Sequence, residues 1–137
     1  MVLAENQKIR IASRAENIIL VERMIEDVCD LFNISEDYYG NILVAITEAV
    51  NNAIQHGNNL DPNKNIDLAY ESSQKNLSFT ISDEGKGFDY TVLLDPTEPE
   101  NIEKPNGRGV FLMRHLADTV DFYENGRIVK LNFNLAS

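Results

Sequence analysis

Residues 47–58 (TEAVNNAIQHGN) constrain this chain most, because they combine helical periodicity with an unusual polar face. At about 100° per residue, one arc carries a single acid, carboxamides and an imidazole: Asn41, Glu48, Asn51, Asn52, Gln55 and His56. The opposite arc is apolar and consists of Ile42, Leu43, Ile46, Ala49, Val50, Ala53 and Ile54. Amphipathic helices usually present a mix of charged residues to water. An amide-rich face therefore indicates either a site that holds a ligand or a metal shell, or a solvated surface rich in Asn.

Two stretches with paired glycines follow further along the chain. Residues 83–89 (DEGKGFD) come directly after an alternating apolar run, and residues 107–113 (GRGVFLM) open a second amphipathic segment. Glycine allows a backbone to approach a ligand closely and to take positive φ, and the free N–H groups at a helix start favour phosphate. On the residues alone, the first stretch also fits a plain turn, and Arg108 either reaches a terminal phosphate or faces solvent. Glu84 and Lys86 receive no role.

Together the three stretches resemble the N box and the two glycine boxes of the GHKL ATPase superfamily, which includes gyrase-type ATPases, heat-shock-90 chaperones, histidine kinases and mismatch-repair ATPases. The pattern E-x-x-x-N-A-x-x-H is matched by Glu48, Asn52, Ala53 and His56, D-x-G-x-G-F by Asp83, Gly85, Gly87 and Phe88, and G-x-G-x-x-L-M by Gly107, Gly109, Leu112 and Met113. The resemblance spans most of the chain. It points to the small stand-alone branch of bacterial anti-sigma factors that are also serine-protein kinases.

The resemblance implies a role for each matched position. Glu48 corresponds to the catalytic general base or water-orienting carboxylate, Asn52 to the ligand of Mg²⁺, and Asp83 to the acceptor of a hydrogen bond from the adenine amino group. His56 corresponds to a residue that orients its neighbours. The implied cofactor-binding set is Asn52, His56, Asp83, Gly85, Gly87, Gly107, Arg108, Gly109 and Val110.

At the level of function, the resemblance implies an ATP-dependent serine/threonine protein kinase and anti-sigma factor that uses ATP and Mg²⁺. Its partners would be an anti-anti-sigma protein of the STAS type, which it phosphorylates on a serine, and a sigma factor. Members of this branch commonly form homodimers. Three alternatives stay open: a non-enzymatic, ATP-gated protein-binding module, the ATP-binding domain of a histidine kinase, and an ATPase without a protein acceptor.

Composition narrows the class of protein. A length of 137 residues suits one domain, so we expect a single ATP-binding domain over residues 1–137. The net charge of −10 argues against a surface that grips nucleic acid. Cys29 is the only cysteine, which fits a reducing compartment. Because no apolar run approaches the roughly 20 residues of a membrane span and the N-terminus lacks a signal-peptide core, we expect a cytoplasmic protein, or a piece of a larger cytoplasmic chain, without a membrane partner.

Periodicity and turn signals predict the order of the elements. These are a strand at 7–12, a helix from a Ser13–Glu16 capping box to about Phe32, a helix from Ser35 to Gly57, strands at 65–72 and 76–82, a helix at 109–117, and strands at 119–124 and 127–135 around Asn125-Gly126. The first helix is expected to bury Ile18, Ile19, Met24, Ile25, Val28 and Leu31, and Tyr70, Phe79 and Ile81 are expected in the core.

The arrangement of these elements predicts the fold class. Strands and helices do not alternate strictly, so we expect a two-layer α/β sandwich, a mostly antiparallel mixed sheet covered on one face by helices. The resemblance implies the same layout, the Bergerat-type ATP-binding fold. Residues 90–106 lack periodicity and hold three of the four prolines. A long loop of this kind is usually functional or mobile, and in this branch it corresponds to a lid.

Overall fold

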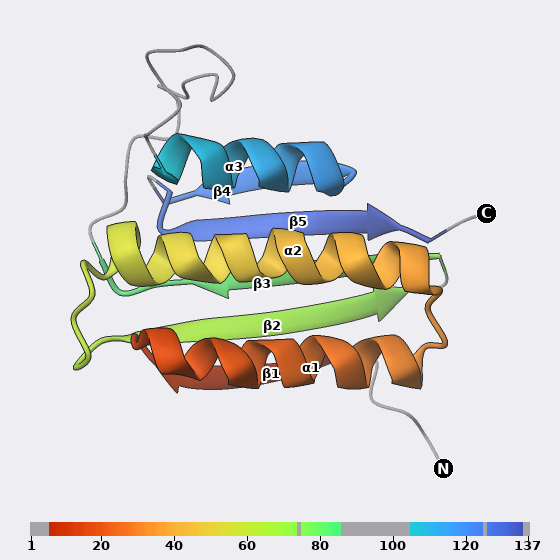
Figure 1. The fold of residues 1–137 in the computed structure, drawn as a ribbon, viewed down its shortest axis with the longest axis horizontal. Coiled ribbons are helices and arrows are strands. Elements are labelled where there is room, and N and C mark those ends of the chain that lie inside the picture. The colour runs from red at the N-terminus through yellow and green to blue at the C-terminus, as the bar shows by residue number, and fades with distance from the viewer. Residues whose placement is uncertain (1–5, 74, 86–104, 125, 136–137) are drawn as a thin grey trace.

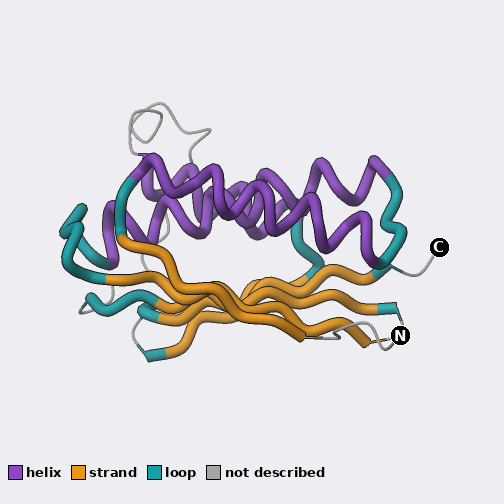
Figure 2. Tube along the Cα trace, turned by 90° about the horizontal axis from the view of Figure 1, so that it is seen from below, coloured by secondary structure: helices purple, strands orange, loops and turns teal. Residues whose placement is uncertain are grey.

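The computed structural model describes residues 6–73, 75–85, 105–124 and 126–135, with only the backbone described for Asn6 and residues 105–109. In this part of the chain, five strands form one sheet and the helices lie together on one face of it (Figures 1 and 2). The elements in order are β1 (Asn6–Ala12), the 3₁₀ turn η1 (Ala15–Asn17), α1 (Ile18–Leu31), α2 (Glu36–Asn52), the π turn η2 (Ala53–Gly57), β2 (Asn65–Ser73), β3 (Asn76–Ser82), α3 (Pro105–Leu116), β4 (Thr119–Tyr123) and β5 (Ile128–Asn134). The predicted two-layer α/β sandwich is therefore confirmed.

The sheet has the strand order β1-β2-β3-β5-β4, and every pairing among the described strands is antiparallel. We expected a mostly antiparallel mixed sheet, and among the described strands only antiparallel pairings are found. Both predicted hairpins, β2–β3 and β4–β5, are present within a residue of their expected bounds. At the β4–β5 turn, Glu124 and Gly126 take left-handed φ values of 52° and 87°, as such short turns require.

The core lies between the sheet and the helices. A row of aromatic rings crosses three strands, with ring centroids 6.3 Å apart for Tyr70 and Phe79 and 6.2 Å apart for Phe79 and Phe133. Such spacing is favourable for aromatic pairs. Tyr70, Phe79 and Ile81 are at most 2% exposed, as predicted. The apolar arc of α2 packs on this layer, and Asn52 of the polar arc is also buried.

The start of α1 differs from the prediction. Ser13 is not an N-cap: its backbone N–H donates to the carbonyl of Lys64 at 3.0 Å, and its buried hydroxyl has no partner in the described part of the chain. The chain then makes the 3₁₀ turn η1 before α1 begins at Ile18. Because a 3₁₀ turn has fewer residues per turn than an α-helix, it changes the phase of the helix that follows.

The buried stripe of α1 agrees with the prediction in part: Met24, Ile25 and Val28 are buried as expected, and Ile18 packs partly buried against the core. The buried residues are Val21, Met24, Ile25, Val28 and Cys29. Ile19 and Leu31, which we expected inside, are 52% and 38% exposed. Burial raises the pKa of the Cys29 thiol to about 11, so this cysteine is unreactive at neutral pH. No helix in the described ranges is both long and apolar enough to cross a membrane.

Candidate functional site

The three motif stretches meet at one end of the sandwich. The C-terminal end of α2, the end of β3, the N-terminal end of α3 and the β4–β5 turn lie at the same end (Figure 1). The backbone N–H of Asp83, directly after β3, donates to the carbonyl of Arg127 at 3.0 Å, which joins two of these segments. Ser82 and Ile128 are paired in register beside them. Residues far apart in sequence are therefore brought to one place.

The end of α2 winds into a π turn. The N–H of Asn58 donates to the carbonyl of Ala53 at 2.8 Å, which is a five-residue step. Such turns often occur at functional sites because they redirect the side chains that follow. Here Gln55 is exposed, although the regular helical arc placed it beside the other amides, and Gly57 and Asn58 are buried instead.

Asn52 and His56 carry polar atoms that are buried without partners. Asn52 is 7% exposed, and its Nδ2 has no hydrogen bond in the described part of the chain. The same is true of Nε2 of the half-buried His56. Burial lowers the pKa of His56, which favours the neutral ring. Leaving a buried polar group without a hydrogen bond costs about 1–3 kcal/mol of stability. A ligand that hydrogen-bonds to these atoms would remove that cost. Glu48, one turn before Asn52, is half-buried.

Asp83 carries a buried carboxylate close to Asn52, and the two residues line the same cavity. It is 7% exposed, and its Oδ1 accepts a hydrogen bond from the Gly85 N–H at 2.8 Å. Burial raises the pKa of Asp83, and the Gly85 hydrogen bond and the positive charge of Arg127 oppose that rise. Within the described ranges, no protein donor reaches its Oδ2, so that oxygen is left to accept a hydrogen bond from a ligand.

Two glycines make room for this carboxylate. A Cβ at Gly57 would lie 2.2 Å from Oδ2 of Asp83, and a Cβ at Gly85 would lie 1.6 Å from the carbonyl oxygen of Gly57. Gly85 does not adopt positive φ, contrary to our expectation. Glycine is required there because two backbone segments touch. Gly87, Phe88 and the expected lid up to residue 104 lie outside the described residues.

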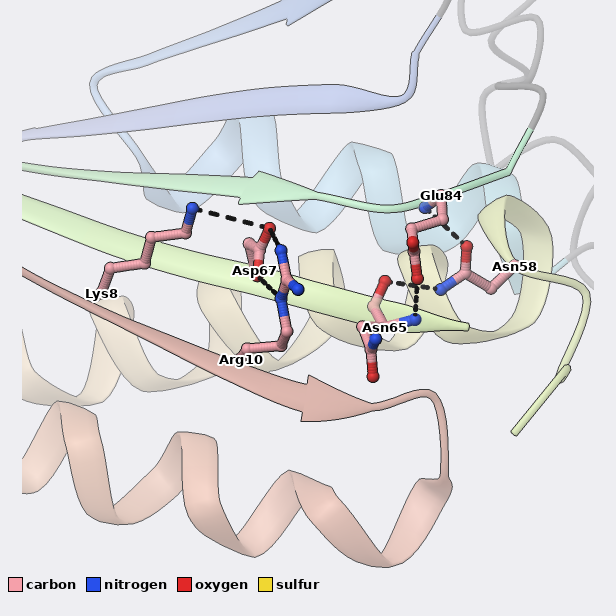
Figure 3. A network of polar contacts seen from close by, with 6 residues as sticks. All are labelled: Lys8, Arg10, Asn58, Asn65, Asp67 and Glu84. Carbon is pink, nitrogen blue, oxygen red and sulfur yellow. Dashed lines mark hydrogen bonds and ion pairs between the residues drawn. The ribbon is translucent and has the colours of Figure 1, made fainter. Parts of the chain in front are cut away.

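A network of polar contacts joins Asn58, Asn65 and Glu84, the residue after Asp83 (Figure 3). Asn58 is fully buried; its Nδ2 donates to the carbonyl of Asn65 at 3.0 Å, and its Oδ1 accepts from the N–H of Glu84 at 2.8 Å. The carboxylate of Glu84 accepts a hydrogen bond from the Asn65 N–H. Sequence reasoning gave Glu84 no role and placed Asn58 in a loop. The only sequence signal was an Asn directly after the glycine that ends the helix.

The start of α3 also differs from the prediction. The helix begins at Pro105, a favoured first residue, so Gly107 and Gly109 lie inside its first turns and do not precede it. Because Pro105 has no N–H, the N–H groups in the first turn that lack helical partners are, by position, those of Asn106 and Gly107. The side chain of Val110 is 1% exposed and belongs to the core, so only its backbone is available to a ligand. The role of Arg108 stays a prediction.

Four motif residues, Asn52, Ala53, Asp83 and Met113, help to line a narrow cavity of about 10 Å³, the space of roughly one water molecule. Its lining comprises Ala49, Asn52, Ala53, Ile81, Asp83, Met113, Phe122, Gly126, Arg127 and Val129. A larger hollow of about 410 Å³ lies between α1 and β1 and contains none of the motif residues. We assign the site to the smaller cavity, because three of the five buried polar side chains in the described ranges, Asn52, Asn58 and Asp83, lie on or beside it.

Comparisons with known proteins concern the family of the chain. The model of a family described as the histidine kinase-like ATPase domain matches residues 11–133, a range that contains all the motif positions. The serine-protein kinase RsbW of Staphylococcus aureus is 27% identical over 128 residues, covering 88% of this chain and 80% of that protein. The serine-protein kinase RsbW of Staphylococcus epidermidis is 28% identical with the same coverage.

A solved structure shows a similar fold. The crystal structure of the RsbU and RsbW domains of a Mycobacterium tuberculosis protein matches with a TM-score of 0.64 and 14% sequence identity. The match covers 98% of this chain and 33% of that one, so the present chain spans about a third of that protein. At this identity the likeness concerns the fold alone.

Proposed function

Because the chain belongs to the histidine kinase-like ATPase domain family, we propose that it is an ATP-dependent serine/threonine protein kinase that also acts as an anti-sigma factor. The observation that carries the proposal is one cavity that holds both a buried amide with an unpartnered nitrogen, Asn52, and a buried carboxylate with an open oxygen, Asp83. Buried polar groups of this kind are hydrogen-bonded in native proteins. A polar ligand would supply the missing partners.

The residues present fit the base of ATP. Adenine has an exocyclic amino group that donates hydrogen bonds, whereas guanine has a carbonyl oxygen at the equivalent position. The open Oδ2 of Asp83 accepts from a donor and repels a carbonyl. A side chain at Gly57 would collide with this oxygen, so glycine at that position leaves it uncovered. The site therefore suits adenine better than guanine.

They also fit a magnesium triphosphate. Mg²⁺ takes oxygen ligands and keeps several waters, so one amide oxygen from Asn52 together with phosphate oxygens is sufficient. The free N–H groups of Asn106 and Gly107, at the start of α3, favour phosphate because of the helix dipole. His56 lies one turn after Asn52, and its neutral ring adds no positive charge to this polar side of the helix.

In this proposal Glu48 is the catalytic base. Bound ATP supplies the phosphoryl group, and transfer depends mainly on positioning and on neutralising charge. Glu48 lies on α2 one turn before Asn52 and is half-buried, so it faces the same region while staying accessible to a second protein. Its carboxylate would take the proton of the acceptor hydroxyl as the new phosphate ester forms and the phosphoanhydride bond to the leaving ADP breaks.

The proposed partners follow from the family branch. The RsbW proteins to which the chain is similar are named serine-protein kinases. For this chain we propose that a STAS-type anti-anti-sigma protein is the substrate, with a serine as acceptor, and that a sigma factor is the sequestered partner. Homodimerisation and a cytoplasmic location belong to the same proposal.

The test is a transfer assay with ATP labelled in the γ-phosphate, Mg²⁺ and candidate anti-anti-sigma proteins. We expect acid-stable label on a serine of the partner and none on this chain. If the protein binds ATP but labels no candidate, the ATP-gated binding module replaces the kinase. If it releases phosphate without any partner being labelled, it is an ATPase without a protein acceptor.

A further inference from the structure

Asn58 is the most deeply buried polar side chain in the described part of the molecule, at 0% exposed. It lies between the end of the π turn, the start of β2 and the residue that follows Asp83 (Figure 3). A fully buried amide is rare and must have partners for its donors and its acceptor. Asn58 has both: Nδ2 donates to the Asn65 carbonyl, and Oδ1 accepts from the Glu84 N–H.

One end of this bridge is fixed to the sheet. Asn65 begins β2 and is paired with Ala12 of β1. Two residues further on the same strand, Asp67 forms a two-point ion pair with Arg10 of β1, with Nε–Oδ1 and Nη2–Oδ2 distances of 2.8 and 3.2 Å. Paired Arg–carboxylate contacts of this kind restrict geometry. Asn65 is therefore a stable support for the amide of Asn58.

The other end of the bridge controls the backbone around Asp83. Three consecutive N–H groups are held there: that of Asp83 by the Arg127 carbonyl, that of Glu84 by Oδ1 of Asn58, and that of Gly85 by the Asp83 carboxylate itself. The Asn58 contact is the central one of the three. It joins the π turn, where Gly57 touches the Asp83 carboxylate, to the peptide that follows Asp83.

We propose that Asn58 is a positioning residue for nucleobase selectivity, acting through Asp83. The inference rests on the proposed binding of ATP and goes beyond it, because Asn58 belongs to none of the three motif patterns and does not line the cavity. Without the bridge, the Glu84 N–H loses its partner and only the neighbouring contacts hold this peptide, so Oδ2 of Asp83 is positioned less precisely. Discrimination between adenine and guanine then falls, while contacts with the phosphates, made by other elements, are retained.

The experiment measures the affinity of Asn58→Ala and of the milder Asn58→Ser for three ligands with Mg²⁺: ATP, GTP and inorganic tripolyphosphate. The parent should prefer ATP. In Asn58→Ala the ratio of ATP to GTP affinity should fall by roughly tenfold, as expected for one misdirected hydrogen bond to a charged group. Affinity for tripolyphosphate should stay within about twofold. The serine variant, whose hydroxyl can satisfy one of the two partners, should lie between the parent and the alanine variant.

Asn76→Ala is the matched control. The Asn76 Nδ2 donates to Oδ1 of Asn132 at 2.7 Å, so this variant also removes an Asn hydrogen bond, at the opposite end of β3. Thermal unfolding should show a loss of stability in both alanine variants, but only the Asn58 variants should lose selectivity. Hydrogen exchange of the Glu84 amide should accelerate in Asn58→Ala and not in Asn76→Ala.

Two results would overturn this inference alone: a parent that binds ATP while both Asn58 variants keep its selectivity, or tripolyphosphate affinity that falls in parallel with ATP affinity. The second result would make Asn58 merely structural. A folded parent that binds none of the three ligands would overturn the proposed function, and this inference with it.

Discussion

Gly57 and Asp83 are packed so closely that a methyl group on residue 57 would lie 2.2 Å from Oδ2 of the carboxylate. The last residue of the π turn thus determines where the Asp83 side chain lies. Gly57→Ala should push the carboxylate away and cost about 1–3 kcal/mol of stability, as overpacking usually does. ATP affinity, measured by calorimetry, should fall by at least tenfold. Unchanged ATP affinity in the folded variant would contradict the role of Asp83.

Gly40→Ala is the matched control for that substitution. Gly40 lies within α2, and a Cβ there would meet nothing within 4 Å. Because alanine is a better helix former than glycine, this variant should gain about 0.5–1 kcal/mol. Thermal unfolding should show opposite signs for the two substitutions, with ATP affinity unchanged in Gly40→Ala. A loss of stability in Gly40→Ala would mean that this face of α2 is covered in solution.

Asp83→Asn should increase stability at neutral pH in the absence of nucleotide. Burial raises the pKa of Asp83 above its ordinary value of 3.8, so the native state keeps the proton to higher pH than the unfolded chain. Stability therefore decreases as pH rises from the unfolded pKa through the folded one. A neutral amide avoids this loss, so the variant should melt higher than the parent at pH 7, with the difference vanishing below about pH 3.8.

The same variant should lose preference for adenine, because an amide can turn its NH₂ toward the base and accept guanine. Calorimetry with ATP and GTP is the measurement. A variant that is less stable than the parent at pH 7 would show that the ionised carboxylate is better compensated in the native state than its burial indicates.

The sequence predicted the parts of the fold that depend on local patterns. Alternation and the Asn125-Gly126 turn were sufficient for both hairpins, because strand register is determined by which face is apolar. Ser13 was misread because capping boxes are recognised from residue types alone, while the Ser13 N–H is already used by Lys64 across the fold. For α1, Met24, Ile25 and Val28 of the expected stripe are buried, whereas Ile19 and Leu31 are exposed.

The candidate site likewise divides into residues that a local sequence pattern identifies and residues that only the fold brings together. Asn52 and Asp83 were found because the motifs name them, whereas the Asn58–Glu84 contact joins residues 26 positions apart and leaves no local pattern. Gly85 was identified for the wrong reason: positive φ and close backbone approach both require glycine, and only the structure shows that here it is contact with Gly57. Partner identity depends on surfaces of other proteins and has no local signal.

Glu48→Gln separates binding from chemistry. Glutamine keeps the size of the side chain and most of its hydrogen bonding but cannot accept the proton of an acceptor hydroxyl. ATP affinity should stay within a few-fold of the parent, because Asn52 and Asp83 are unchanged. Phosphoryl transfer to a partner serine should fall by roughly 10²–10⁴, the usual range for a lost general base. Sequestration of the second partner should survive, since it needs the nucleotide-bound shape and no turnover. An unchanged transfer rate in single-turnover assays would remove Glu48 from the catalytic role and leave positioning by the cavity as the source of the activity.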